Sequence, residues 1–160
     1  MSASASITSP VVDSPEDHQG RWRVAGSAAM NHAMAMASGD LVTHLDDDEH
    51  LPRRLERLVS FMMDTQCDAA WHPFWYETDE GTWELNEATT FSVDPVTTSA
   101  IIYRRWLTRI EWDTRAHLLI EPGDWHRFRR FKFLGADIKR YAEPLLRHYR
   151  ERAQVAGSPE

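Results

Sequence analysis

Four consecutive acids, Asp46, Asp47, Asp48 and Glu49, follow a short apolar run at residues 40–45. The run has the length and β-branched content of a buried strand, so the acids stand at a strand end, where open α/β sheets bind ligands. Adjacent carboxylates repel one another, and a bound cation relieves that repulsion. Carboxylate oxygens are hard ligands that suit Mg²⁺ or Mn²⁺, which also bind phosphate. The acidic run therefore predicts a divalent-cation site.

Two other interpretations of the acidic run stay open. In the first, Asp48 caps the following helix, with Pro52 in the first turn of that helix and the other acids solvated near its positive end. In the second, the chain is a metal-dependent hydrolase that uses His44, His50 and the acids. The sequence offers no ordered His-x-x-His spacing in support of that hydrolase.

Composition limits the classes to which the chain can belong. The 160 residues, 42% of them hydrophobic, suffice for about one domain with a buried core. The net charge of −7 argues against a nucleic-acid partner, because such binding needs surplus Lys and Arg. Cys67 is the only cysteine, which excludes an intrachain disulfide and fits a cytoplasmic protein. We recognise no signal peptide and no apolar run of the roughly 18 residues that a transmembrane span needs.

The elements that position the acids are predicted from hydrophobic spacing. A helix is expected before the acids at residues 28–37, where Gly39 ends it, and another after them at 51–65. The charged residues of the second helix, Arg54 among them, are expected to face solvent. Its buried stripe is expected to comprise Leu55, Leu58, Val59 and Met62.

The second half of the chain predicts further strands and one more helix. Asp124 stands at the start of a helix in which every third residue from Trp125 to Leu134 is apolar, and Asp in that place is commonly a helix cap. The aromatic runs on either side of Gly81 predict a β-hairpin. Strands are expected at residues 68–77, 82–85, 96–103, 137–141 and 145–150.

Two segments resemble family 2 glycosyltransferases of the GT-A fold. The first runs from Asn31 through the strand to LDDDEHLPRRLERL. It is similar to the segment around the family's DxD motif, in which Ala-x-Gly-Asp/Glu, a hydrophobic strand, Leu-Asp-x-Asp-Asp and Pro-x-x-Leu-Glu follow one another. The second segment, Glu121-Pro122-Gly123-Asp124-Trp125 with Gly135-Ala136-Asp137 and the stretch 143–150, resembles the family's catalytic helix and closing strands. Together the two resemblances cover about residues 24–150.

The resemblance implies an α/β fold, namely a truncated GT-A domain with a mixed sheet flanked by helices and without the first nucleotide-binding strand. We expect this domain at residues 21–152, after a mostly disordered segment at 1–20 and before a disordered tail at 153–160. Met30 stands where members often carry Arg. The alternative is therefore a non-catalytic relative, or a module completed by a partner domain or by a second copy of the chain.

The function that the resemblance implies is transfer of a sugar from a nucleotide-diphosphate-sugar donor to an acceptor hydroxyl. The transfer would invert the anomeric carbon and use Mn²⁺ or Mg²⁺, and Asp124 matches the position of the catalytic base. The other implied site residues are Asp46, Asp47 and Asn31 for the donor, Asp46 and Asp48 for the metal, Thr97, Thr98, Ser99 and Trp125 on the acceptor side, and Arg147 and His148 for the diphosphate.

Overall fold

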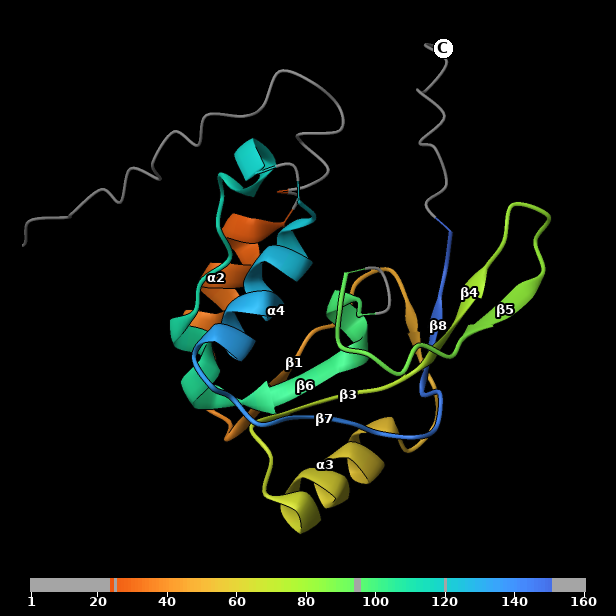
Figure 1. The fold of residues 1–160 in the computed structure, drawn as a ribbon, viewed down its shortest axis with the longest axis horizontal. Coiled ribbons are helices and arrows are strands. Elements are labelled where there is room, and N and C mark those ends of the chain that lie inside the picture. The colour runs from red at the N-terminus through yellow and green to blue at the C-terminus, as the bar shows by residue number, and fades with distance from the viewer. Residues whose placement is uncertain (1–23, 25, 94–95, 120, 151–160) are drawn as a thin grey trace, which may run out of the picture.

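Two four-stranded sheets and their flanking helices make up the part of the chain that the computed structural model describes (Figure 1). This part comprises residues 24, 26–93, 96–119 and 121–150. The segments that we expect to be disordered, 1–20 and 153–160, lie outside the described residues. The mixed α/β class predicted from the sequence is confirmed.

The first sheet carries the acidic run at one of its edges. Its strands, in spatial order, are β1 (Leu41–Thr43), β6 (Ile101–Arg104), β3 (Ala69–Trp71) and β7 (Ile138–Arg140). β6 is antiparallel to β1 and to β3, whereas β3 and β7 are parallel. The sheet is therefore mixed, and the four acids begin three residues after the end of edge strand β1.

The second sheet holds the closing strand of the chain and the predicted hairpin. Its order is β2 (Glu49–His50), β8 (Leu146–His148), β4 (Phe74–Glu77) and β5 (Trp83–Asn86). β4 and β5 pair antiparallel, which confirms the hairpin. The aromatic run predicted as one strand at 68–77 is divided between the two sheets, because Pro73 follows β3 and has no N–H for a strand ladder.

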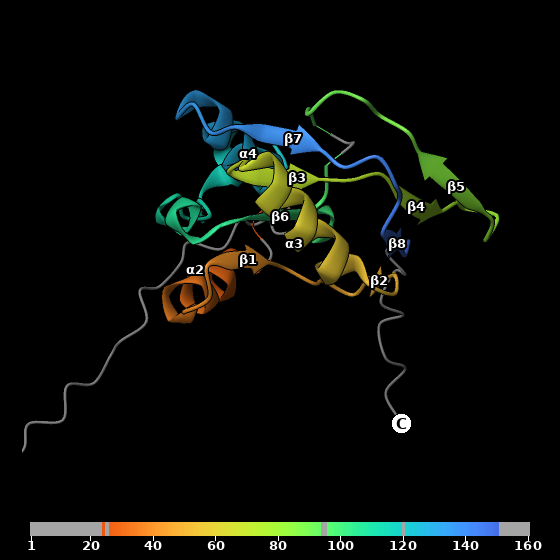
Figure 2. The ribbon, with the colours of Figure 1, turned by 90° about the horizontal axis from the view of Figure 1, so that it is seen from below.

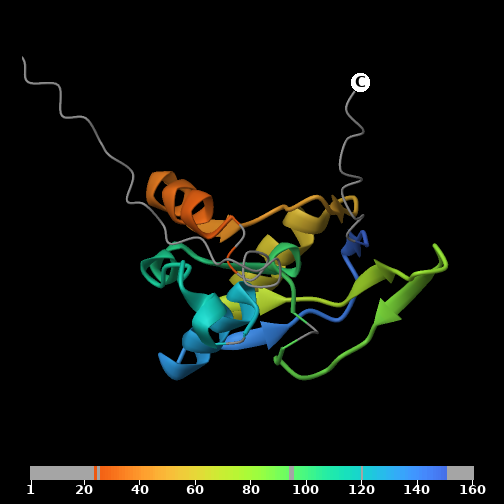
Figure 3. The same ribbon diagram turned by 90° about the horizontal axis from the view of Figure 1, so that it is seen from above.

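Helices cover both faces of the first sheet. Figure 2 shows α3 (Arg54–Thr65) across one face, and Figure 3 shows the opposite face, where α2 (Ser27–Met36) and α4 (Gly123–Phe133) lie. Side chains of β6 alternate between the two layers: Ile101 and Tyr103 join the core under α2 and α4, and Ile102 joins the core with α3. The shorter helical turns are η1 (Thr98–Ala100), η2 (Arg105–Arg109) and η3 (Ala116–Leu119).

The buried stripe of α3 differs from the prediction. Leu58 and Met62 are buried as expected, but Leu55 is 53% exposed and Val59 is 39% exposed. Arg54, predicted to face solvent, takes the remaining buried position. Arg54, Leu58 and Met62 are spaced by four residues and therefore share one face of the helix. Hydrophobic periodicity favours the apolar residues for the buried face. The Arg54 guanidinium is nevertheless buried, because it donates to the carbonyls of Ser99 and Ile101.

The predicted strand at 96–103 is wrong in its first half. Residues Thr98–Ala100 form η1, and the strand β6 begins only at Ile101. The reason is local, because Thr97 Oγ1 accepts the N–H of Ser99 at 3.2 Å and so favours a turn over a strand ladder. Two other predictions ran too far: β1 ends at Thr43, and Leu134 lies beyond α4 and is 62% exposed.

Candidate active site

The acids that follow β1 are held in different ways. The backbone N–H of Asp46 donates to Ser99 Oγ at 3.1 Å, which fixes the chain as it leaves the strand. Asp48 accepts a hydrogen bond from His148 Nδ1 at 2.8 Å and another from the N–H of Tyr149 at 3.3 Å. The first strand end and the last strand of the chain are thereby joined through one carboxylate.

Two expectations for the acidic run change with this geometry. Asp48 is not the cap of α3, because the residue before that helix is Arg53 and no side chain caps it. Glu49 belongs to β2, where its Oε2 lies 3.2 Å from both Arg147 Nη1 and the Tyr149 hydroxyl. The acids are therefore not one solvated group, and Glu49 is committed elsewhere.

The pKa values of this cluster are shifted in different directions. Desolvation, followed by the charges of Asp48 and Asp47, raises the pKa of Asp46. Burial also acts to raise the pKa of Asp48, but hydrogen bonds, chiefly that from His148, outweigh it and lower this pKa. The same hydrogen bond raises the pKa of His148 despite partial burial. An ionised Asp48 beside a protonated His148 is the favoured state of the pair.

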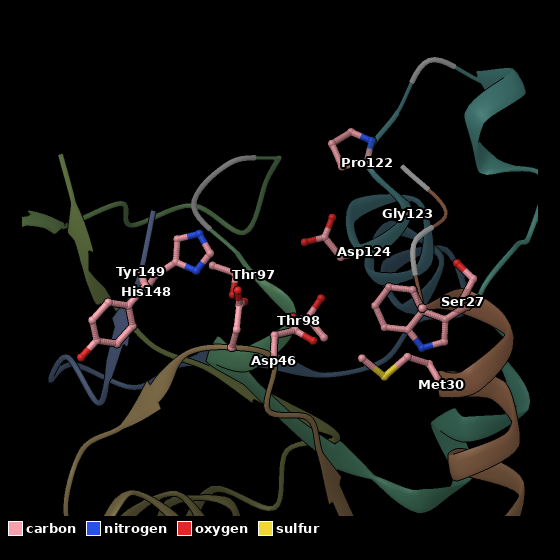
Figure 4. Close-up of a pocket in the computed structure, with 13 residues that line it drawn as sticks. Ser27, Met30, Asp46, Thr97, Thr98, Pro122, Gly123, Asp124, His148 and Tyr149 are labelled. Carbon is pink, nitrogen blue, oxygen red and sulfur yellow. The ribbon is translucent and has the colours of Figure 1, made fainter. Parts of the chain in front are cut away.

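A pocket with a volume of about 530 Å³ opens beside this cluster (Figure 4). The N-terminal ends of two helices meet there, at Gly26 and Ser27 for α2 and at Gly123 for α4. Gly26 has φ +72°, a left-handed conformation that glycine adopts without strain as the chain turns into α2. Helix N-termini carry partial positive charge and unpaired N–H groups, so this wall of the pocket suits an anion. The other lining residues are Met30, Asp46, Asp47, Thr97, Thr98, Trp112, Pro122, Asp124, His148 and Tyr149.

Asp124 lines the same pocket as Asp46 but comes from the first turn of α4. Its Oδ1 accepts the N–H of Trp125 at 2.6 Å. The capping position of α4 is Pro122, so Asp124 is not the cap that the sequence suggested. Desolvation raises the pKa of Asp124 to about 6, the Trp125 hydrogen bond opposes this rise, and the negative charge of Asp46 adds to it. A carboxylate with this pKa is suited to accept a proton near neutral pH.

Trp112 lines the pocket, and Asn31 positions it. Asn31, predicted to contact the donor, donates from Nδ2 to the carbonyl of Trp112 at 2.9 Å and accepts the Trp112 N–H on Oδ1 at 2.7 Å. Both ends of the Asn31 amide are thus used, and Asn31 is not among the residues that line the pocket. This geometry favours a positioning role for Asn31.

The residues predicted for the acceptor side fall into two groups. Thr97 and Thr98 line the pocket (Figure 4), and Ser99 is buried behind them, where it holds Asp46. Trp125 is not among the lining residues, because its ring packs on Phe91 with a centroid distance of 5.8 Å.

The two basic residues predicted for the diphosphate also separate. His148 lines the pocket, whereas Arg147, its neighbour on β8, pairs with Glu49 at 3.2 Å and is not among the lining residues. Neighbouring residues of a strand point to opposite faces, so only His148 faces the site.

Comparison with known proteins identifies the family. A family model described as "Glycosyl transferase family 2" matches residues 19–134. The chain belongs to glycosyl transferase family 2. A search of curated proteins gave no match.

Solved structures show the same fold for this family 2 chain. The crystal structure of S. aureus TarS 1-349 in complex with UDP has a TM-score of 0.61 and 15% identity, and the match covers 80% of this chain and 41% of TarS. The TarS 1-349 structure without a named ligand has a TM-score of 0.56 at 15% identity and covers 78% of this chain and 40% of TarS. The complex with UDP-GlcNAc has a TM-score of 0.53 at 14% identity, with coverage of 78% and 38%. The chain thus spans about two fifths of these TarS structures, and its predicted GT-A fold is confirmed.

The carboxylate oxygens of Asp46 and Asp48 are of the kind that binds a hard divalent cation. Asp48 Oδ2 is buried and has no hydrogen-bond partner among the described residues, while Asp46, in the same loop, lines the pocket. No group of three or more His, Cys, Asp or Glu side chains in the described ranges is arranged to hold a metal ion. Two carboxylates suffice for Mg²⁺ or Mn²⁺ when water and phosphate oxygens complete the coordination. We therefore retain Asp46 and Asp48 as predicted ligands.

A buried network beneath the site was missed in the sequence. Arg54 donates from Nη2 to the carbonyl of Ser99 at 2.7 Å and to Thr43 Oγ1 at 3.1 Å, and from Nε to His72 Nε2 at 3.0 Å. Burial, then the Arg54 charge, lowers the pKa of His72 to about 3, so His72 is neutral and accepts on Nε2. Because Ser99 holds Asp46, Arg54 supports the acidic loop from below. The only local signal for it was the spacing of Arg54 to Leu58.

Two other expectations bear on the class of this family 2 domain. His44, a ligand in the hydrolase interpretation, is buried and lies with Nε2 2.6 Å from the Tyr103 hydroxyl. Burial, followed by the charge of Arg127, lowers the pKa of His44 to about 4. His44 is therefore engaged with Tyr103 in the core beside the site.

None of the helices in the described part of the chain is long and apolar enough to span a membrane.

Proposed function

We propose that this family 2 domain transfers a sugar from a nucleotide-diphosphate-sugar donor to an acceptor hydroxyl, with inversion at the anomeric carbon. The observation that carries the proposal is that Asp46 and Asp124, from different elements, line one pocket at which two helix N-termini also meet. The carboxylates supply a cation site and a base, and the helix ends favour a diphosphate. UDP-sugars are the first donors to consider, because TarS is described in complex with UDP and UDP-GlcNAc.

Asp124 is the proposed catalytic base. As the acceptor oxygen forms its bond to the anomeric carbon, its proton passes to the Asp124 carboxylate, and the bond between that carbon and the diphosphate oxygen breaks. The electron pair of the broken bond leaves with the nucleoside diphosphate. A single displacement of this kind inverts the anomeric carbon. The pKa of about 6 leaves Asp124 ionised, and so able to accept the proton, at neutral pH.

The remaining residues bind and orient the reactants. Asp46 and Asp48 would hold Mn²⁺ or Mg²⁺, which when bound neutralises charge on the leaving diphosphate. His148 lines the same pocket, and its hydrogen bond to Asp48 raises its pKa, which favours positive charge there. Thr97 and Thr98 present hydroxyls on the side where we propose that the acceptor lies. A cytoplasmic location remains a prediction from the single cysteine.

The proposal is tested without knowledge of the acceptor, since water serves as a slow one. The chain is incubated with UDP-, GDP- and TDP-sugars in Mn²⁺, and release of nucleoside diphosphate is measured, with and without EDTA. We expect metal-dependent release from at least one UDP-sugar. If a donor binds but no sugar is released or transferred, the non-catalytic or partner-completed alternative is favoured. If no donor binds, the proposed function is wrong.

A further inference from the structure

One face of the second sheet carries aromatic and charged side chains that the proposed reaction does not use. Residues paired directly across strands point to the same face of a sheet. Trp75 pairs with Leu85 and Arg147, and Arg147 pairs with Glu49, so these side chains share one face. We call the surface formed by Trp75, Trp83, Arg147 and Tyr149 the aromatic face.

Trp83 is the most exposed aromatic residue of this face and is also well supported. It is 37% exposed, its ring lies edge-on to Tyr149 with a centroid distance of 5.2 Å, and Arg147 Cζ lies 5.7 Å from its ring centroid. Glu49 accepts from both supporting residues, at 3.2 Å from Arg147 Nη1 and 3.2 Å from the Tyr149 hydroxyl. The indole is therefore held in place while part of its surface stays open to solvent.

The aromatic face lies on the side of β8 opposite to His148 and meets the pocket at Tyr149, the residue that follows this strand. Tyr149 is among the residues that line the pocket (Figure 4), and its ring also contacts Trp83, so one residue belongs to both surfaces. Trp83 begins β5, on the hairpin that extends away from the body of the molecule (Figure 1). A long ligand that enters the pocket past Tyr149 would therefore meet Trp83 next.

The chemistry of the face fits a sugar. Indole and phenol rings offer flat apolar surfaces with a polar group at one edge. A pyranose ring has C–H groups on its faces and hydroxyls at its rim, so the two can stack. Arg147 and Glu49 are paired with each other, yet each side chain is 48% exposed and retains capacity for hydrogen bonds to hydroxyls. Because their charges compensate, the surface has no excess of positive charge that would attract an anionic membrane.

We propose that the aromatic face is an outer acceptor subsite, at which Trp83 stacks on a sugar ring of a saccharide acceptor whose reacting hydroxyl lies in the pocket. The proposal rests on the proposed glycosyl transfer and adds the class of acceptor to it. Trp83 binds substrate here and takes no part in the chemical step. A longer saccharide gains this contact, whereas a monosaccharide acceptor is too short to reach it.

The first test is direct binding. Maltohexaose, cellohexaose and chitohexaose are titrated against wild type, Trp83→Ala, Trp83→Phe and Trp106→Ala, with detection by calorimetry and by the indole N–H signals in NMR spectra. Trp106 is a matched control, because it is 40% exposed on η2 and is not part of the aromatic face. We expect at least one hexasaccharide to bind about tenfold more weakly to Trp83→Ala. Trp83→Phe should lose less, and Trp106→Ala should bind as wild type does.

The second test separates this proposal from the proposed function. With a hexasaccharide acceptor, Trp83→Ala should lower kcat/KM about tenfold, while donor hydrolysis and transfer to the matching methyl glycoside stay unchanged. If no donor is turned over but hexasaccharide binding still depends on Trp83, the subsite stands and the proposed function fails.

Three results would overturn the subsite. They are equal hexasaccharide affinity of wild type and Trp83→Ala, no binding of any of the three saccharides, and self-association in sedimentation experiments that Trp83→Ala abolishes. The last result would reassign the aromatic face to a contact between copies of the chain. Unchanged donor binding by Trp83→Ala shows that the variant is folded.

Discussion

Asn31 and the backbone of Trp112, 81 positions apart, exchange two hydrogen bonds of 2.9 and 2.7 Å. This pair fixes part of the pocket wall, because Trp112 lines the pocket and Asn31 holds both its carbonyl and its N–H. The Asn31 side chain thus satisfies both backbone groups of Trp112, as a neighbouring strand would in a sheet.

Asn31→Ala should lower the free energy of unfolding. It leaves the N–H and the carbonyl of Trp112 without partners in a partly buried place, which costs about 1–3 kcal/mol. Denaturant melts measure the loss, and His32→Ala on the exposed face of α2 is the control. If Asn31 contacts the donor instead, Asn31→Ala will melt like wild type and will only weaken donor binding.

Arg54 gives a second stability prediction, which concerns the network beneath the site. Arg54→Lys keeps the positive charge but cannot donate to Ser99, Thr43 and His72 together, so we expect a loss of about 2 kcal/mol. The control is Arg53→Lys, at a side chain that is 66% exposed and paired with Glu56, where the melt should match that of wild type. Similar melts for both variants would contradict the role of the network.

The prediction for the metal distinguishes members of the acidic run. Asp48→Asn should weaken Mn²⁺ binding at least tenfold, since loss of a second-shell partner alone costs about 10–100-fold. Glu49→Gln is the matched control, because the Glu49 carboxylate is engaged by Arg147 and Tyr149. Calorimetric titration with Mn²⁺ in the presence of UDP compares the variants. Equal Mn²⁺ affinity of wild type and Asp48→Asn would remove Asp48 from the ligand set.

The sequence was sufficient where the signal is contiguous. The acids after β1, the helix that begins beside Asp124 and the hairpin each follow from residues within one short segment, and the structure contains all three. These local patterns also carried the resemblance to the family. The first sheet could be predicted as mixed because the family resemblance supplied an order of strands that spacing does not contain.

The rest of the site depends on contacts between distant segments. Trp112 and Tyr149 complete the pocket, but no local pattern near either residue indicates the acids. Asn31 was predicted to contact the donor from the family resemblance, and its hydrogen-bond partner Trp112, 81 residues away, could not be read from the sequence. Arg54 was placed in solvent because a charged residue on a helix usually faces water, and the acceptors that bury it, the carbonyl of Ser99 among them, lie in another element.

Asp124→Asn is the variant that separates a catalytic base from a structural carboxylate. Asn can still accept the N–H of Trp125, so the start of α4 is preserved, but it cannot take a proton from the acceptor. Turnover should fall by about 10²–10⁴. In wild type, kcat/KM should rise with pH through an apparent pKa of about 6, because the base must be ionised, and the variant should lack this rise. Turnover equal to that of wild type would exclude Asp124 as the base.

Stability gives the same carboxylate a second, independent test. The pKa of Asp124 is higher in the folded chain than its usual 3.8, so the folded state binds more protons between pH 3.8 and 6. This group therefore favours folding below that range, and its contribution is lost as pH rises through 6. In buffer with EDTA, Asp124→Asn should be more stable than wild type at pH 8, by on the order of 1–3 kcal/mol, and the difference should shrink towards pH 4. Melts that differ by the same amount at both pH values would show that the Asp124 carboxylate is not held in the desolvated state that suits a base.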